Sequence, residues 1–345
     1  MAGAEEYSEA LGNAESARIY RTPAERRNAG LGREITEWLR ISTLAELEDE
    51  SRQNNFSNGL SVTEDERAVL TLQLGLDFTI SDWLQAELIF EAESDGVNNH
   101  SRLDEGFISA EIEQWGIKIG PQYVPFGEYY SQFVTGPLLE FGETNADSLI
   151  VDYEITNHIE LAGFVYDSEV GRQTGGDSFD WGARIEFSSE DESRVLGLSY
   201  LSDLAESDEE FLKDENNSFE RKVPAWNVYG LYAFSQFAIT AEVVSAIGEF
   251  AEFEPVSDSP SAYNIEFAYF PGATVQLAIR TERSDELEDA PRQQYGISAS
   301  WRPRGNISLS IDYLRASYKN GFVLDGDDND LENSNSVAAQ LALEW

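Results

Sequence analysis

Several residue types are missing from this 345-residue chain or rare in it, and each shortage excludes a class of site. There is no cysteine, so disulfides, zinc–thiolate sites and cysteine nucleophiles are excluded. The two histidines, His100 and His158, are too few for a histidine-rich metal centre or a conventional hydrolase triad. We therefore expect neither an enzyme nor a dedicated metal site or cofactor.

Positive charge and long hydrophobic runs are also scarce. Lys and Arg number 23 against 65 Asp and Glu, and the formal net charge of −42 argues against binding to nucleic-acid phosphates. No apolar run approaches the roughly 20 residues that a membrane-spanning helix requires. A membrane protein is still compatible with this pattern, because transmembrane strands alternate apolar and polar residues.

The chain divides into two parts by its residue pattern. Residues 1–34 are rich in Ala, Glu and Arg and do not alternate, so we expect an N-terminal periplasmic extension that is helical or loosely ordered. From residue 35 onward apolar residues recur at every second position, most clearly over 68–80. The sequence therefore predicts one all-β domain over residues 35–345.

The alternation predicts about sixteen strands, each close to the 9–11 residues of a membrane-barrel strand. The expected strands are 35–47, 68–80, 84–92, 105–113, 116–123, 147–155, 158–166, 179–187, 194–201, 223–234, 237–246, 261–270, 274–282, 293–301, 306–315 and 335–345. Short turns alternate with long connections such as 48–66, 94–104 and 202–222. This arrangement is typical of a transmembrane antiparallel β-barrel in the outer membrane of a Gram-negative bacterium, with short periplasmic turns and long external loops.

Aromatic residues support a barrel. Phe179 and Phe187 bracket one apolar stripe, and Tyr263 and Tyr269 bracket another, as expected where both ends of a strand meet lipid headgroups. The chain ends on Trp345 in the apolar phase, which resembles the C-terminal recognition signal of bacterial outer-membrane proteins. A soluble sandwich or propeller is the alternative, but no self-similar blade motif is found.

The polar positions of the strands are expected to face a wet lumen, because unpaired charges cannot be buried cheaply. Sixteen strands enclose a lumen wide enough for a channel, and an excess of carboxylates favours cations. Alternatively, many of these charges pair across neighbouring strands and only keep the wall solvated. The predicted pore-lining charges are Arg40, Glu87, Glu91, Glu111, Glu113, Asp152, Asp180, Arg184, Glu186, Glu242 and Arg280.

Residues 120–146, after the fifth expected strand, are too apolar and aromatic for an ordinary external loop. We expect this stretch to fold inward and narrow the channel, with rings against the wall and carboxylates toward water. The predicted constriction residues are Tyr123, Phe126, Glu128, Tyr129, Tyr130, Glu140 and Glu143. The alternative is an external loop packed against its neighbour.

Three short motifs in this stretch, VPFG (124–127), GPL (136–138) and FGET (141–144), resemble the LbtU-like siderophore porin family. The resemblance covers about residues 116–155, and the rest of the chain follows the general porin pattern. It implies an outer-membrane barrel associated with ferric-siderophore uptake outside the energised-receptor system. The phosphate-selective porin group shares the architecture, but this lumen is too acidic for a phosphate path.

The predicted function is a channel for passive or facilitated uptake of small solutes, ferric siderophores among them, with a preference for cations. The alternative is a non-transport outer-membrane barrel with a structural or adhesive role, or one that sheathes a partner protein. Expected partners are lipid, lipopolysaccharide and the solute, in a monomer or a trimer. The acidic stretches 206–210, 285–289 and 325–330 suggest divalent cations bridging to lipopolysaccharide, or adaptation to salt.

Overall fold

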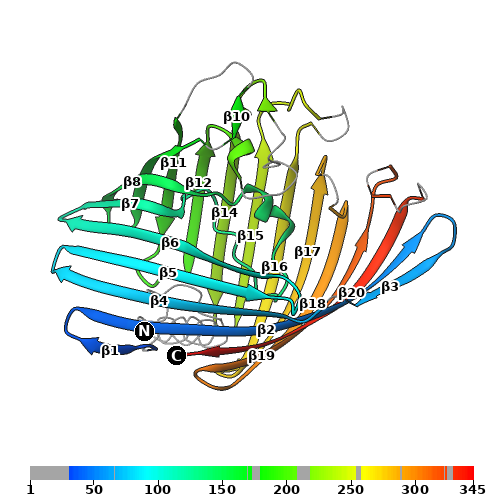
Figure 1. Ribbon diagram of the computed structural model, residues 1–345, viewed down its shortest axis with the longest axis horizontal. Helices are drawn as coiled ribbons and strands as arrows, with labels where there is room; N and C mark the ends of the chain where they lie inside the picture. The colour runs from blue at the N-terminus through cyan, green and yellow to red at the C-terminus, as the bar shows by residue number, and fades with distance from the viewer. Residues whose placement is uncertain are drawn as a thin grey trace.

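The computed structural model describes residues 31–345 apart from 66, 169, 173–178, 208–217, 254–257, 288–289, 322 and 325–328. Eighteen strands form one sheet, in which sixteen close an antiparallel barrel while β1 (Arg33–Thr36) and β3 (Ser61–Asp65) only extend its edges (Figure 1). Among the described residues, no helix is long and apolar enough to cross a membrane.

Every expected strand overlaps one strand of the barrel, so the prediction of an all-β, sixteen-strand architecture is confirmed. The barrel strands are β2 (Leu39–Phe56), β4 (Val69–Ser81), β5 (Leu84–Ser94), β6 (Asn99–Ile112), β7 (Trp115–Tyr123), β8 (Asn145–Thr156), β9 (Ile159–Asp167), β11 (Phe179–Ser188), β12 (Arg194–Leu201), β14 (Ala225–Phe234), β15 (Phe237–Ala246), β16 (Ser261–Gly272), β17 (Val275–Asp285), β18 (Gln293–Arg304), β19 (Ile307–Ser317) and β20 (Leu331–Glu344). The connections also contain β10 (Gly171–Arg172), β13 (Ser218–Phe219) and two 3₁₀ turns, η1 (Leu138–Gly142) and η2 (Leu204–Glu206).

The two faces of the barrel wall differ in polarity, because successive side chains of a strand point to opposite faces. On β17, Leu277 and Ile279 are exposed (44% and 57%), whereas Ala278 and Arg280 between and beside them are buried (4% and 3%). Exposed aliphatic residues recur in this phase around the barrel, and the other phase holds most of the polar and small residues together with some buried large ones such as Leu44 and Phe164. The outer face is therefore apolar and the inner face carries the charges.

The barrel closes between its first and last strands. β20 pairs with β19 on one side and with β2 on the other. Thr43 and Trp345 exchange backbone hydrogen bonds of 2.6 and 2.9 Å, so the C-terminus lies beside β2 (Figure 1). Arg33 and Glu34, which were expected in the N-terminal extension, pair with β2 in β1, while residues 1–30 of that predicted extension lie outside the described residues.

Two connections expected to be loops contain strand instead. β2 continues to Phe56 and forms a hairpin with β3 that projects at the right of Figure 1, so the prediction of a loop over 48–66 is wrong. Similarly, β6 begins at Asn99, inside the predicted loop 94–104. The side chains of both stretches are mostly polar on both faces, so the backbone ladder forms there without the apolar alternation that identifies a strand.

Candidate functional site

The connection between β7 and β8, residues 124–144 (the β7–β8 segment), is held by acidic side chains of distant strands. Glu242 on β15 accepts hydrogen bonds from the backbone N–H groups of Glu128 and Tyr129, both at 2.9 Å. The side-chain amide of Asn227 on β14 also donates to Glu242, at 2.6 Å. One carboxylate therefore satisfies two backbone donors at the start of the segment, which an irregular backbone cannot satisfy by itself.

Two further strands of the wall, β16 and β19, repeat this arrangement. Glu266 on β16 accepts from the Ser131 hydroxyl and the Gln132 backbone N–H, both at 2.7 Å. Asp312 on β19 accepts from the Val134 backbone N–H at 2.6 Å. The segment is thus hydrogen-bonded to β15, β16 and β19, with one acidic anchor for every few residues.

Arg280 on β17 is the cation of this anchor network. Its Nε lies 2.8 Å from the Glu282 carboxylate, and its Nη1 donates to the Thr135 carbonyl at 2.8 Å. The guanidinium also lies 4.4 Å from the ring centroid of Phe133, in cation–π geometry. Glu282 in turn accepts from the Leu138 backbone N–H at 2.7 Å. Arg280 and its carboxylates therefore hold both the backbone and a ring of the segment.

The burial of these anchors corrects part of the pore-lining prediction. Glu242 and Arg280 are only 9% and 3% exposed, because the segment covers them. They bond to the segment and to their neighbours and are shielded from the passage. The register of β16 and β17, which places Glu266 opposite Arg280, could have suggested an ion pair, but nothing local in the sequence indicates what covers it.

Two other predicted pore charges lie elsewhere. Glu113 is in the turn between β6 and β7 with a φ of +57°, so the reversal of the chain removes it from the wall. Asp180 is fully buried, and its Oδ1 atom accepts from Ser202 at 2.7 Å and pairs with Lys222 at 2.6 Å. Neither side chain is placed to line a passage.

Apolar side chains of the segment are buried together with the long connections. Phe126 and Leu139 are 0% exposed, and they belong to one cluster with Leu204 of η2 and with Phe219 and Phe250 of the β12–β14 and β15–β16 connections. Burial of each large apolar side chain contributes on the order of 1.5–3 kcal/mol to the stability of the folded state. Phe126, predicted as a constriction residue, is therefore part of a hydrophobic core.

A cavity of about 470 Å³ lies between the segment and the strands on the other side. The other six predicted constriction residues line it, namely Tyr123, Glu128, Tyr129, Tyr130, Glu140 and Glu143. The wall contributes Gln73, Glu91, Asp104, Glu105 and Gln340 among others. Of these five wall residues, only Glu91 was predicted, and the acids Asp104 and Glu105 were missed. Asp104 is the last residue of the expected loop 94–104. It is also the extra residue of a β-bulge in β6, because Glu105 pairs with Ile89 of β5 and Leu103 pairs with Phe90.

Arg184 forms the second group of charges beside the segment. Its Nη2 atom lies 2.6 Å from Glu160, and its Nη1 lies 3.6 Å from Glu128 and 3.9 Å from Glu186. Glu186 also accepts a hydrogen bond from the Tyr229 hydroxyl. The predicted wall charges Arg184 and Glu186 thus meet the predicted constriction residue Glu128, and the pair Arg184–Glu128 joins the wall to the segment.

The remaining predicted wall charges lie on the inner phase of their strands with part of their surface accessible. Arg40, Glu87, Glu91 and Asp152 are half-buried, and Glu111 is exposed. Glu91 pairs with Arg102 at 3.1 Å. The structure does not bring these residues together in one cluster, since they come from β2, β5, β6 and β8.

The acidic external stretches are described only in part. Residues 208–210, 288–289 and 325–328, which belong to the three stretches predicted to bind divalent cations, lie outside the described residues. Within the second stretch, the Glu286 carboxylate accepts from the Ser259 backbone N–H at 3.1 Å. Burial, together with the hydrogen bond that the protonated Glu286 donates to Asp258, raises the pKa of Glu286 above its usual value.

Comparison with known proteins supports the fold at low sequence identity. No family model matches the chain. A UPF0422 protein of Coxiella burnetii is 31% identical over 166 residues, which are 44% of this chain and 35% of that protein, so the chain spans about a third of this curated relative. The match is too short to assign a family.

Solved outer-membrane proteins share the architecture over nearly the whole chain. OprB of Pseudomonas putida superposes with a TM-score of 0.62 at 10% identity, covering 93% of this chain and 96% of OprB. OmpF of Salmonella typhi, solved with daunomycin, gives 0.59 at 12% identity over 95% and 99% of the two chains. The outer-membrane channel DcaP of Acinetobacter baumannii gives 0.58 at 12% identity over 91% and 100%. These similarities establish a porin-like barrel fold.

Proposed function

We propose that this protein is an outer-membrane channel through which small water-soluble solutes diffuse, with the β7–β8 segment as its constriction. The exposed aliphatic residues of the outer face would contact lipid, and the charged inner face would contact water. The anchors on β15, β16, β17 and β19 would hold the segment against one side of the lumen. The passage would then run between the segment and β4, β5 and β6, where the cavity lies.

A preference for cations is the second part of the proposal, and the lining of the cavity is the observation that carries it. Its acidic residues are Glu91, Asp104, Glu105, Glu128, Glu140 and Glu143. Within the described part of the chain, no lysine or arginine lines this cavity. Some of these carboxylates are partly compensated, since Arg102 lies within 3.1 Å of Glu91. The remaining excess of negative potential would concentrate cations and slow anions.

Single-channel recording in planar bilayers tests the channel, and reversal potentials across a KCl gradient test its selectivity. Because the chain has no cysteine, a single Glu140→Cys variant carries the only thiol. A bulky water-soluble thiol reagent should reduce its conductance, whereas the same reagent should leave a Glu113→Cys variant unchanged. Absence of conductance in the wild type would contradict the channel, and equal insensitivity of both variants would contradict the constriction.

Ferric siderophores are the finer hypothesis for the solute, and the motifs of residues 124–144 are its basis. Tyr123, Tyr129 and Tyr130 line the cavity beside the carboxylates, so a bulky, partly aromatic complex of neutral or positive charge would be favoured there. Influx into proteoliposomes of cationic and anionic ferric siderophores of similar size is the direct test. Equal rates for both complexes, or no influx beyond that of protein-free liposomes, would contradict this hypothesis.

A non-transport barrel is the competing function, and the large buried apolar cluster favours it. That cluster joins the segment to the β12–β14 and β15–β16 connections and fills part of the interior. A structural or adhesive barrel would give correctly folded, heat-modifiable protein without ion conductance.

A further inference from the structure

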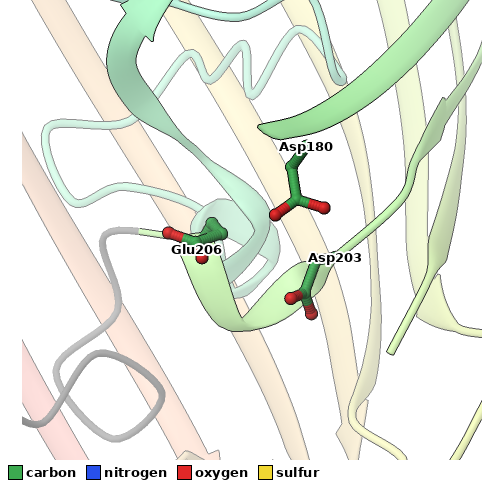
Figure 2. A group of neighbouring side chains, drawn as sticks. All are labelled: Asp180, Asp203 and Glu206. Carbon is green, nitrogen blue, oxygen red and sulfur yellow. The ribbon is translucent and has the colours of Figure 1, made fainter. Parts of the chain in front are cut away.

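Three acidic side chains meet at the end of the barrel that carries the long connections. Asp180 lies on β11, Asp203 caps the start of η2 in the β12–β14 connection, and Glu206 is the last residue of η2. One carboxylate oxygen from each lies within 4.8 Å of the other two, and the residues are only 0%, 0% and 3% exposed. Figure 2 shows Asp180 extending from its strand toward the turn that carries the other two.

The Asp180 carboxylate supplies an independent indication that this cluster binds a ligand. Its Oδ1 atom accepts from the Ser202 hydroxyl at 2.7 Å and pairs with the Lys222 ammonium at 2.6 Å. Its Oδ2 atom is buried and has no hydrogen-bond partner among the described residues. Leaving a charged oxygen buried and unsatisfied is costly, and a cation at this point would remove the cost.

The other two carboxylates are held in place by backbone groups. Asp203 Oδ1 accepts from the N–H groups of Val223 and Ala205, at 3.1 and 3.3 Å. Glu206 accepts from the Val170 N–H at 3.3 Å and from the Ser168 hydroxyl. Each carboxylate therefore has a fixed orientation, so a ligand would not have to order mobile side chains before binding.

The donor set points to a hard cation. The three ligands are carboxylate oxygens, and oxygen-only sites suit Ca²⁺ and Mg²⁺ rather than metals that prefer sulfur or imidazole. Two oxygens bound to the same Ca²⁺ at about 2.4 Å can be at most about 4.8 Å apart, which matches the spacing of this cluster. Mg²⁺ requires nearly ideal octahedral geometry, whereas Ca²⁺ accepts irregular sites. We propose that Asp180, Asp203 and Glu206 bind one Ca²⁺ ion.

The position of the site indicates what the ion would do. Leu204 and Ala205, between Asp203 and Glu206, are fully buried in the apolar cluster. Asp180 belongs to the barrel wall, so an ion bound to all three residues would join the β12–β14 connection to β11. Calcium would thereby stabilise the packed connections, whether or not the barrel conducts ions.

Calcium binding should be measured on protein refolded in defined detergent, free of lipopolysaccharide and treated with EDTA. Equilibrium dialysis with radioactive Ca²⁺ should give one site of highest affinity, and Ca²⁺ should raise the thermal unfolding midpoint. Asp180→Asn and Glu206→Gln should each abolish that site and the thermal shift. Asp82→Asn, which removes an exposed acid in the turn between β4 and β5, is the matched control and should retain both.

Several outcomes would overturn the proposal. One is equal Ca²⁺ binding in the wild type and in both cluster variants. Another is displacement of Ca²⁺ by equimolar Mg²⁺, which would contradict a calcium site. Since Asp180→Asn also removes the partner of Lys222, each variant should first be compared with the wild type in EDTA by heat-modifiability on gels. If Asp180→Asn does not fold, Glu206→Gln alone decides, and unaltered Ca²⁺ affinity in that variant refutes the site.

Discussion

Two parts of the inner wall use the same residue types for different purposes. On β15–β19 the charged residues Glu242, Glu266 and Arg280 are buried under the β7–β8 segment and bond to it. On β5 and β6 the acids Glu91 and Glu105 border the cavity. All of them occupy the inner phase of an alternating strand. Residue type and phase therefore place a charge inside the barrel, but the covering segment determines whether it meets water.

The largest difference in stability between the two parts of the wall should appear when an arginine is replaced by alanine. Arg280→Ala leaves Glu282 and Glu266 buried without their cation, and breaking a buried ion pair in this way costs about 3–5 kcal/mol. Arg102→Ala removes a guanidinium whose side chain is 62% exposed from carboxylates that are 17% exposed at Glu91 and 8% exposed at Asp104. Because solvent screens the guanidinium, the cost should be smaller, about 1 kcal/mol. Urea unfolding in detergent micelles, followed by heat-modifiability, measures both. Equal costs would mean that the anchor network is not buried in solution.

A smaller effect is expected at one carboxylate anchor. In Glu242→Gln, an amide NH₂ replaces one of the two oxygens that accept from Glu128 and Tyr129, so one buried backbone donor loses its acceptor. An unsatisfied buried donor costs about 1–3 kcal/mol. The same change at the exposed Glu111 should stay within about 0.5 kcal/mol. Open-channel noise should rise in Glu242→Gln only, and quiet, wild-type currents would show that Glu242 does not hold the constriction.

Packing beneath the segment can be tested at glycine. A Cβ at Gly296 on β18 would lie 2.6 Å from the Phe133 ring and 2.7 Å from Leu314, so Gly296→Ala should destabilise by about 1–3 kcal/mol. Both neighbours are side chains that can shift, so we expect a destabilisation near the lower end of this range. Gly163→Ala on β9 meets nothing within 4 Å and should be nearly neutral in the same unfolding assay. A neutral Gly296→Ala would indicate a loosely packed segment.

The smallest effect on stability, together with a clear functional effect, is expected on the cavity side of the segment. Glu140→Gln combined with Glu143→Gln should change the unfolding free energy by about 0.5 kcal/mol or less, with little change in conductance. It should move the reversal potential across a KCl gradient toward zero, because negative charge is lost from the cavity lining. Glu113→Gln, in the β6–β7 turn, should leave selectivity unchanged. An unaltered reversal potential in the double variant would contradict the cation proposal.

The strands of the barrel could be predicted because their signal is local. Alternating residues such as Leu70, Leu72 and Leu74 report the outer phase directly, and each hairpin turn fixes the register of its two strands. The hairpin of β2 and β3 was missed because polar residues on both faces give no alternation. Strands with polar side chains on both faces therefore cannot be predicted from the alternation of apolar residues.

The aromatic and acidic character of residues 120–146 distinguishes this stretch in the sequence, and six residues named from it line the cavity. Their role as a constriction stays a prediction. The roles of Glu242 and Arg280 depend on contacts between residues more than 100 positions apart, such as Glu128 with Glu242. No local sequence pattern indicates such a contact. The burial of Asp180 likewise depends on contacts with Ser202 and Lys222, which belong to other elements.

The way the barrel closes has a consequence for how the chain reaches this state. β2, the first long strand, pairs along its edge with β20, the last, and Thr43 bonds to the terminal residue Trp345. Contacts of such extreme sequence separation carry the full entropy of ordering the chain between them, and they slow folding. Until synthesis has delivered β20, β2 keeps an unpaired edge that invites association with other chains. Closure of the barrel must therefore follow synthesis of β20, and loss of β20 would leave an open, aggregation-prone sheet.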